Sequence, residues 1–287
     1  MKQISTAVLG CGVIGASWVK AFREAGLTVR LWDPTGAAAQ AAATRHADGV
    51  TICDTPEAAV DGVGFVQENG PERLSVKRDL GQRIAEALAP NAIIASSTST
   101  LLASDIQRGL PFAERLLIGH PFNPPHILPL VEVVGGTETA EWAIQGAMEF
   151  YTSLGKSPIR LHVERAGHLA NRLQAALWRE AVDAVASGQA SVTDVDAAVT
   201  LALGPRWALT GPFATFALGG GEGGLAHFLD HLGAPFEALW DDAQRPDMTA
   251  DLQAHLVAQL TEAPRRLTGA ERDQRLRAVL AIAENGG

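Results

Sequence analysis

A glycine-rich turn near the beginning of the chain lies between two strand-like segments and leaves few folds open to this sequence. Residues 4–9 are small or apolar, residues 14–25 repeat apolar side chains at helical spacing, and residues 28–32 again favour a strand. A strand, a tight turn, a helix and a second strand within about 30 residues form a βαβ unit. Such a unit requires parallel strands joined by a right-handed crossover. We therefore expect an α/β fold built on a doubly wound sheet.

The turn itself has the spacing of a dinucleotide-binding loop. Its sequence fits G-x-G-x-x-G and reads Gly10-Cys11-Gly12-Val13-Ile14-Gly15. The three glycines allow a tight turn, close approach of a pyrophosphate, and close packing of helix on strand. Asp33 ends the next strand, where a carboxylate bonds the hydroxyls of the adenosine ribose. Because a carboxylate repels a 2′-phosphate, we expect NAD rather than NADP as the cofactor. We expect no metal ion.

Strand-like and helix-like segments alternate until about residue 165. Further strands are predicted over residues 64–67, 92–95, 116–119, 130–134 and 158–163, with helices over 73–88 and 141–154. From residue 166 onward the apolar side chains recur at helical spacing alone. There, Thr193 and Asp196 have the spacing of a capping box, and Gly204-Pro205 is expected to end the following helix. We predict a Rossmann-type domain over residues 1–165 and an all-α domain over residues 166–287.

Charge and composition limit the partners. The chain of 287 residues has 23 Lys and Arg against 32 Asp and Glu, a formal net charge of −9, and two cysteines. A negative surface repels phosphate backbones, so we expect no nucleic-acid partner. Two cysteines give no disulfide framework, and no apolar run approaches the length of a membrane span. These features, with no signal-peptide pattern at residue 1, are typical of a cytoplasmic protein that does not enter a membrane.

Polar residues follow the predicted strands at the edge where open α/β sheets carry their chemistry. His120 follows the strand over residues 116–119, and a neutral histidine is suited to accept the proton of a secondary alcohol during its oxidation. Glu132 is an acid within an apolar strand, and a carboxylate there can hold the other ring nitrogen of the base. The hydroxyl-rich residues 96–100 follow another strand and are expected to face the same crevice. His126, in a proline-rich loop, is interpreted as structural.

Six motifs, taken in order, resemble the L-3-hydroxyacyl-CoA dehydrogenase superfamily over nearly the whole chain. They are the glycine turn, the segment over residues 67–77, Ser-Thr-Ser-Thr at 97–100, His-Pro-Phe-Asn-Pro at 120–124, Leu-Val-Glu-Val-Val at 130–134, and Asn-Arg at 171–172. The resemblance implies a Rossmann domain followed by a helical domain that forms a homodimer.

The resemblance also implies roles for individual residues. It implies that His120 is the base and Glu132 the partner that orients it. Hydrogen bonds to the substrate oxygen are implied for Ser99 and Asn171, and a place near the nicotinamide for Glu72 and Lys77. Taken singly, each residue has a structural alternative, such as a strand-edge acid at Glu132 or a solvated helix charge at Lys77.

The region after Asp33 bears on the substrate. Acyl-CoA members of the superfamily carry a long helical insertion whose basic residues contact CoA, whereas here 34 residues separate Asp33 from Glu68 and Arg45 is their only Lys or Arg. The chain therefore resembles more closely the branch that acts on small free L-3-hydroxy acids, the carnitine and gulonate dehydrogenases. This implies oxidation of a 3-hydroxyl to a 3-keto group, with L-carnitine to 3-dehydrocarnitine as the preferred reaction. Arg206 suits the carboxylate of such an acid, and its trimethylammonium group suits an aromatic cage, for which the helical half offers Trp178, Trp207, Phe213 and Phe216.

Alternatives remain at this stage. The substrate can be L-gulonate or an L-3-hydroxyacyl-CoA such as 3-hydroxybutyryl-CoA. A non-catalytic, crystallin-like NAD-binding protein is a third reading, because the superfamily includes a lens crystallin. Aromatic residues on helices more often belong to a core or a dimer interface than to a ligand site, and this alternative applies to those of the helical half.

Overall fold

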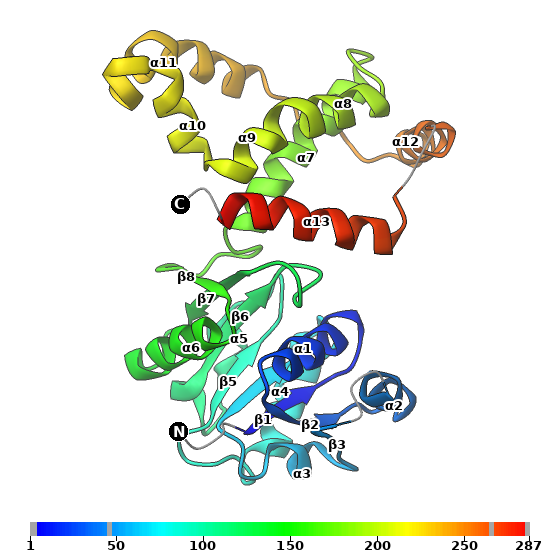
Figure 1. Ribbon diagram of the computed structural model, residues 1–287, viewed down its shortest axis with the longest axis vertical. Helices are drawn as coiled ribbons and strands as arrows, with labels where there is room; N and C mark the ends of the chain where they lie inside the picture. Colours follow the sequence, from blue (N-terminus) through cyan, green and yellow to red (C-terminus); the bar gives the residue numbers. More distant parts are fainter. Residues whose placement is uncertain (1–4, 45–47, 264–266, 285–287) are drawn as a thin grey trace. The chain divides into compact units, whose positions relative to one another are not determined.

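A computed structural model describes residues 5–44, 48–263 and 267–284 (Figure 1). The chain divides into two compact units, Met1–Arg172 and Leu173–Gly287. Ile4, at the start of the first predicted strand, and Arg45 lie outside the described residues. The domain boundary near residue 165 stays a prediction.

Within the described part of the first unit, eight strands form one sheet in the order β3-β2-β1-β4-β5-β6-β7-β8. The strands are β1 (Ser5–Leu9), β2 (Thr28–Trp32), β3 (Val50–Ile52), β4 (Phe65–Glu68), β5 (Ile93–Ser96), β6 (Leu116–Pro121), β7 (Leu130–Gly135) and β8 (Ser157–Arg160). All neighbours pair in parallel except β6 and β7, which are antiparallel. Only residues 122–129 join β6 to β7, too few for the crossover that a parallel pair needs.

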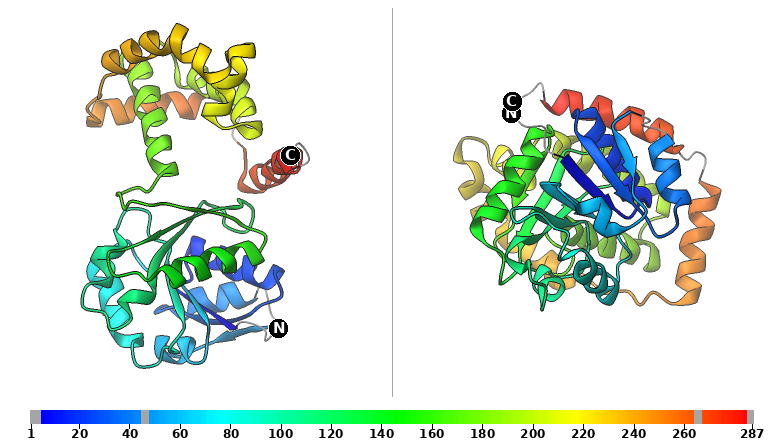
Figure 2. Two further views of the ribbon diagram at one scale, coloured as in Figure 1. Left: turned by 90° about the vertical axis from the view of Figure 1, so that its left-hand side faces the viewer. Right: turned by 90° about the horizontal axis from the view of Figure 1, so that it is seen from below.

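Helices cover both faces of this sheet, as expected for a doubly wound fold (Figures 1 and 2). One face is covered by α1 (Val13–Glu24), α2 (Ala37–Thr44) and α6 (Glu141–Ser153), where Trp18, Phe22 and Phe150 belong to one buried cluster. The other face is covered by α3 (Pro56–Val60), α4 (Leu74–Ile84) and α5 (Ala103–Gln107), where Ile84 and Ile106 belong to a second. A 3₁₀ turn over Ala113–Arg115 precedes β6. The predicted α/β sheet is confirmed.

The second unit is helical. Its elements are α7 (Ala170–Ala186, whose first three residues belong to the first unit), α8 (Val192–Ala198), a π-helical turn (Val199–Leu203), α9 (Gly204–Leu209), α10 (Pro212–Gly219), a 3₁₀ turn (Gly221–Gly223), α11 (Gly224–Asp242), α12 (Ala250–Glu262) and α13 (Gly269–Glu284). The predicted all-α part of the fold is therefore confirmed. No helix in the described part of the chain is long and apolar enough to cross a membrane.

Two predictions about the helices of the second unit were wrong. The capping box is formed by Ser191 and Asp194, not by Thr193 and Asp196, because Ser191 is the residue with extended backbone directly before α8. Gly204-Pro205 does not end a helix but begins α9. Proline is tolerated there because the first turn of a helix does not use that N–H group.

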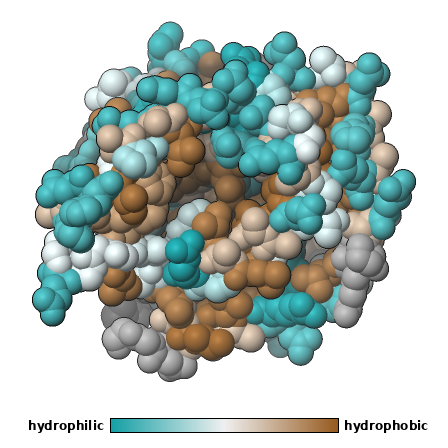
Figure 3. All heavy atoms as spheres, turned by 90° about the horizontal axis from the view of Figure 1, so that it is seen from above, coloured by the Kyte–Doolittle hydropathy of each residue, from teal (hydrophilic) through white to brown (hydrophobic). Residues whose placement is uncertain are grey.

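The second unit exposes much apolar surface. Among its described residues, the buried apolar side chains are Val182 and Val185, both on α7. Large exposed apolar residues include Trp178, Leu201, Phe213, Leu218, Leu239 and Trp240. An apolar groove of about 560 Å³ is lined by α7, α8, the π-helical turn and α12. On the face drawn in Figure 3, brown apolar side chains are exposed among teal hydrophilic ones. Exposure of this much apolar surface to water is unfavourable.

Candidate active site

The glycine turn joins β1 to α1, and two of its glycines are required by packing. Gly10 has φ +90°, and a Cβ there would lie 2.8 Å from the backbone of Asn69. A Cβ on Gly15 would lie 1.9 Å from the carbonyl oxygen of Gly10. At Gly12, by contrast, no described atom lies within 4 Å of an added Cβ. Gly12 therefore leaves open space directly before the helix.

This open space lies at a helix N-terminus suited to an anion. Gly12 is the N-cap of α1, and among the described residues no side chain caps the helix and no acidic residue occupies its first turn. The first N–H groups of a helix lack intrahelical partners and the helix dipole places positive charge there. The turn therefore fits the pyrophosphate of a dinucleotide.

Asp33 lies directly after β2 and its carboxylate faces the same turn. Its Oδ2 accepts a hydrogen bond of 2.7 Å from the Cys11 amide, and its Oδ1 accepts bonds from the amide and hydroxyl of Thr35 at 2.8 and 2.6 Å. Burial alone would raise the pKa of Asp33, but these bonds outweigh it and hold the pKa below its usual value. An ionised carboxylate is thus held beside the anion site.

The Cys11 thiol is not a reactive group. Burial, together with the nearby charge of Asp33, raises its pKa to about 12. Its Sγ lies 3.6 Å from the carbonyl oxygen of Trp32. Cys11 is therefore a protonated side chain of the turn at neutral pH.

His120 and Glu132 form a buried pair across β6 and β7. The antiparallel register places them directly opposite each other, and His120 Nδ1 lies 2.8 Å from Glu132 Oε2. His120 is 4% exposed and Glu132 is 0% exposed. Glu132 is therefore no solvated edge acid but the hydrogen-bond partner of the histidine.

The second oxygen of Glu132 binds the beginning of α7. Its Oε1 accepts hydrogen bonds from the amides of Leu169 and Ala170 at 2.9 and 2.8 Å. Burial would raise the pKa of Glu132, but the bonds from His120 and from these amides hold the pKa below its usual value. Because Asn171 follows Ala170 directly, this anchor also brings Asn171 to the region of the pair.

Glu72 shapes the turn that carries Ser99. Its Oε1 accepts hydrogen bonds from the Thr98 hydroxyl (2.6 Å), the Ser99 amide (3.0 Å) and both the amide and hydroxyl of Thr100 (2.8 and 2.7 Å). Burial opposes these bonds, but together with the charge of Lys77 they hold the pKa of Glu72 below its usual value. The Ser99 hydroxyl makes no hydrogen bond to the described residues and is available to a ligand.

Lys77 is buried and pairs with Glu68, an acid that is not among the predicted site residues. Its Nζ lies 2.8 and 3.0 Å from the two carboxylate oxygens of Glu68 and 3.1 Å from the carbonyl oxygen of Gly70. Glu68 also accepts the Ser96 hydroxyl at 2.5 Å. Lys77 is thus neither a solvated charge nor hydrogen-bonded to Glu72. A charged residue at the end of a buried strand was the signal for Glu68.

Comparison with known proteins identifies the family to which this chain belongs. Residues 35–164 match the family described as 3-hydroxyacyl-CoA dehydrogenase, NAD binding domain, and residues 167–252 match its C-terminal domain. The L-carnitine dehydrogenase of Streptomyces coelicolor is 45% identical, over 90% of this chain and 86% of that protein. The chain belongs to the 3-hydroxyacyl-CoA dehydrogenase family. The L-carnitine dehydrogenase of Pseudomonas putida is 39% identical over 99% of this chain and 96% of that protein.

Solved structures agree with this membership of the 3-hydroxyacyl-CoA dehydrogenase family. An NAD-dependent dismutase, 5-formyl-3-hydroxy-2-methylpyridine 4-carboxylic acid 5-dehydrogenase, superposes with a TM-score of 0.85 at 27% identity over 100% of both chains. A 3-hydroxyacyl-CoA dehydrogenase of Archaeoglobus fulgidus shares the fold, with a TM-score of 0.73 at 24% identity over 98% of this chain and 99% of that chain. The protein is an oxidoreductase that uses NAD and acts on a CH–OH group.

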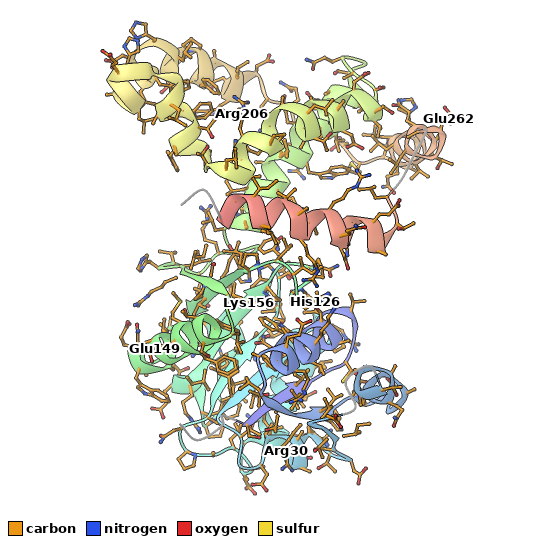
Figure 4. The ribbon with its side chains drawn as sticks, in the orientation of Figure 1. Arg30, His126, Glu149, Lys156, Arg206 and Glu262 are labelled. Carbon is orange, nitrogen blue, oxygen red and sulfur yellow. The ribbon has the colours of Figure 1, made fainter. Side chains whose placement is uncertain are left out.

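The loop after His120, residues 122–129, is fixed by contacts of His126 and Lys156. His126 Nδ1 lies 2.7 Å from the Ser17 hydroxyl on α1, and Lys156 Nζ donates to the carbonyl oxygens of Pro125 and Leu128 (Figure 4). Both contacts join residues 122–129 to neighbouring elements. The interpretation of His126 as structural agrees with its contact to Ser17.

The predicted substrate residues Arg206 and Trp207 lie in the second unit, on α9; Arg206 is labelled in Figure 4. Arg206 Nε donates to the carbonyl oxygen of Ala202 one turn earlier, and Trp207 is 40% exposed. Their contact with substrate stays a prediction. The described residues contain no group of three or more His, Cys, Asp or Glu side chains arranged to hold a metal ion.

Proposed function

We propose that this enzyme oxidises L-carnitine, a small free L-3-hydroxy acid, to 3-dehydrocarnitine. The observation that carries the chemistry is the buried His120–Glu132 pair, a base with an ionised partner. The substrate rests on the carnitine dehydrogenases that share 38–45% identity with the chain. Between β2 and β4 the described helices are α2, of eight residues, and α3, of five, with no long hairpin to receive CoA.

The pair is arranged for general base catalysis. A carboxylate only accepts hydrogen bonds, so His120 Nδ1 carries the proton and Nε2 offers its lone pair to the substrate hydroxyl. When Nε2 takes that proton, the negative charge of Glu132 stabilises the imidazolium. Two backbone amides keep Glu132 ionised and fixed in place. The chemistry that NAD supplies when bound is acceptance of the hydride.

Two donors are proposed for the substrate oxygen. Ser99 lies on the turn organised by Glu72, and Asn171 lies in the first turn of α7 directly after the amides that bind Glu132. Both side chains carry polar hydrogens and are held by fixed backbone. Such preorganised donors stabilise an oxygen on which negative charge develops.

The cofactor is proposed to bind along the carboxyl edge of β1, β2 and β4. Gly10-Cys11-Gly12-Val13-Ile14-Gly15 would hold the pyrophosphate and Asp33 the adenosine ribose. Glu72 and Lys77 would lie toward the nicotinamide. Because Lys77 is bonded to Glu68 and Gly70, its contribution is to fix residues 68–70 in place.

The substrate tail and the assembly are proposed from the second unit. Arg206 would bind the carboxylate and Trp207 the trimethylammonium group. The exposed apolar helices of this unit support a homodimer, since association would remove that surface from water. The two cysteines in the described residues are free thiols, which supports a reducing cytoplasm.

Reduction of NAD with a panel of acids tests this proposal. The panel contains L-carnitine, L-gulonate, L-3-hydroxybutyrate and 3-hydroxybutyryl-CoA, and we expect the highest kcat/KM with L-carnitine. His120→Ala should abolish turnover of the preferred acid, while the exposed control His162→Ala should leave it unchanged. A higher kcat/KM with gulonate or with the CoA thioester would replace the proposed substrate. No turnover of any panel member would favour a binding protein, and activity retained in His120→Ala would refute the mechanism.

A further inference from the structure

His168 combines three unfavourable features beside the catalytic pair. It is 4% exposed, and among the described non-glycine residues it has the one positive φ, 50°. Its Nδ1 is buried and has no hydrogen-bond partner in the described part of the chain. A strained backbone and an unsatisfied nitrogen both oppose folding, and such costs concentrate at functional sites. An apolar residue would fill the same space without the second cost.

The other ring nitrogen makes a specific contact. His168 Nε2 lies 2.9 Å from the carbonyl oxygen of Thr98, in a buried position. Because a carbonyl can only accept, Nε2 carries the proton and Nδ1 does not. The ring centroid also lies 5.0 Å from that of His120, with the two planes inclined at 45°. One side chain therefore contacts both the hydroxyl-rich turn and the base.

The chain positions on either side of these contacts are those proposed to bind the substrate. Thr98 directly precedes Ser99. The two amides after His168, those of Leu169 and Ala170, bind Glu132, and Asn171 follows them. His168 thus joins the turn that bears Ser99 to the beginning of the helix that bears Asn171. Among the described residues, the His168 side chain bonds to the Thr98 carbonyl and also contacts the His120 ring.

We propose that His168 is a positioning residue: its Nε2–H donor sets the spacing of Ser99 and Asn171 around His120. This inference rests on the proposed function, in which those two side chains hold the substrate oxygen. The contact acts on the reacting geometry rather than on overall stability, because α7 is already anchored through Glu132 and the turn through Glu72.

The charge state of His168 is compatible with this role. Burial lowers its pKa, and the charge of His120 acts in the same direction, while the Thr98 bond and the carboxylates Glu132 and Glu72 act against it. The ring is therefore neutral near pH 7. A neutral neighbour does not oppose the positive charge that His120 acquires when it accepts a proton.

Two amide substitutions separate positioning from a structural role. In His168→Gln the side-chain N–H lies as many bonds from Cα as Nε2 does, so it can reach the Thr98 carbonyl. In His168→Asn it lies one bond nearer and cannot reach, but asparagine tolerates the positive φ better than glutamine. We expect His168→Asn to have the higher Tm of the two and the lower kcat. The order of activity is thus opposite to the order of stability.

The expected values follow from misplacement of reacting groups. His168→Asn should lose at least about tenfold in kcat with the preferred acid, while His168→Gln stays within about threefold of the unchanged enzyme. The Kd of NAD should stay the same in both variants, since none of the contacts of His168 involves the glycine turn. The exposed His162→Asn serves as the control and should change neither kcat nor Tm.

A second readout does not depend on activity. Without NAD, hydrogen–deuterium exchange of the peptide over residues 96–101 should be faster in His168→Asn and unchanged in His168→Gln. A kcat for His168→Asn within about threefold of the unchanged enzyme, or a lower kcat in His168→Gln than in His168→Asn, would overturn the proposal. If the enzyme prefers another acid of the panel, the carnitine assignment fails, and the comparison is decided on that acid. If none is oxidised, the exchange experiment decides it.

Discussion

Replacing Glu132 by glutamine tests the proposed role of the His120–Glu132 pair, because the structure determines which way the new amide must face. Glu132 accepts one hydrogen bond from His120 through Oε2 and two from the amides of Leu169 and Ala170 through Oε1. Glutamine has only one accepting oxygen, so it cannot serve both sides. One of the two sides must therefore meet its NH₂ group.

The energies of the two orientations differ clearly. If the amide oxygen faces His120, two buried backbone donors lose their acceptor, at about 1–3 kcal/mol each, or about 2–6 kcal/mol together. If the oxygen faces those donors, the NH₂ group faces His120 Nδ1, and the only change is to the other neutral tautomer of the ring. The second orientation is favoured. It places the ring proton on Nε2, where the substrate proton should go.

We therefore expect Glu132→Gln to fold and bind NAD but to lose about 10²- to 10⁴-fold in kcat. The assay is NAD reduction with the preferred acid, with the Kd of NAD measured separately. Glu164→Gln is the matched control, since Glu164 also accepts an amide and a hydroxyl of one residue, Ser104, but does not contact His120. A kcat within about tenfold of the unchanged enzyme would refute the argument from the tautomer.

Four further predictions concern the cofactor site and the ionised groups. Asp33→Ser should lower the ratio of kcat/KM for NAD to that for NADP by at least about tenfold, because it removes the charge that repels a 2′-phosphate; an unchanged ratio would count against the assigned role. Gly15→Ala should raise the Kd of NAD and lower Tm, since its Cβ would lie 1.9 Å from the Gly10 oxygen, whereas a Kd and Tm equal to those of the unchanged protein would show that the turn yields. Cys11 should resist alkylation at pH 7 in the folded protein because its pKa is raised to about 12, and mass spectrometry that finds it modified before unfolding would contradict this. Folding lowers the pKa of Glu132, so the stability that its ionised form contributes is complete above the unfolded value of about 4.3 and is lost as the pH falls through the folded value. The Tm of Glu132→Gln should therefore fall less between about pH 5 and pH 3 than the Tm of the unchanged protein. Equal changes of Tm with pH in the two proteins would refute this.

The α/β sheet and the helical second half could be predicted because their signals are local. Hydrophobic periodicity and the glycine turn depend on residues within one element or on neighbours in the chain. The first βαβ unit is therefore predicted from residues 4–33, and the order of the later elements from the periodicity of the residues that follow. Elements of three to five residues, such as β3, α3 and α5, were missed because so short a segment shows no period. The predicted helix over residues 73–88 is shorter in the structure and ends at Ile84, and Leu88 forms an isolated bridge with Asp61, which lies far from it in the sequence.

The residues of the candidate site were named from motifs, but their partners were not all readable. His120 and Glu132 are twelve positions apart, and it is the antiparallel register of β6 and β7 that sets them opposite each other. Lys77 has carboxylates at both positions 68 and 72 within reach along the chain, and the buried end of β4 provides Glu68. His168 lies outside the quoted motifs, and its contacts to Thr98 and His120 span 70 and 48 positions. Its only local signal was a histidine that follows a glycine just before a helix.

The difference has one physical cause. Side-chain period, turn geometry and helix caps are determined by a residue and its near neighbours, so the amino-acid sequence alone specifies the dinucleotide turn, the order of strands and helices, and the family motifs. Hydrogen bonds between buried polar groups depend on which strands become neighbours and in which register. The hydrogen bond between His120 and Glu132, the pairing of Lys77 with Glu68 and the contact of His168 with Thr98 therefore arise only when distant segments meet in the folded sheet.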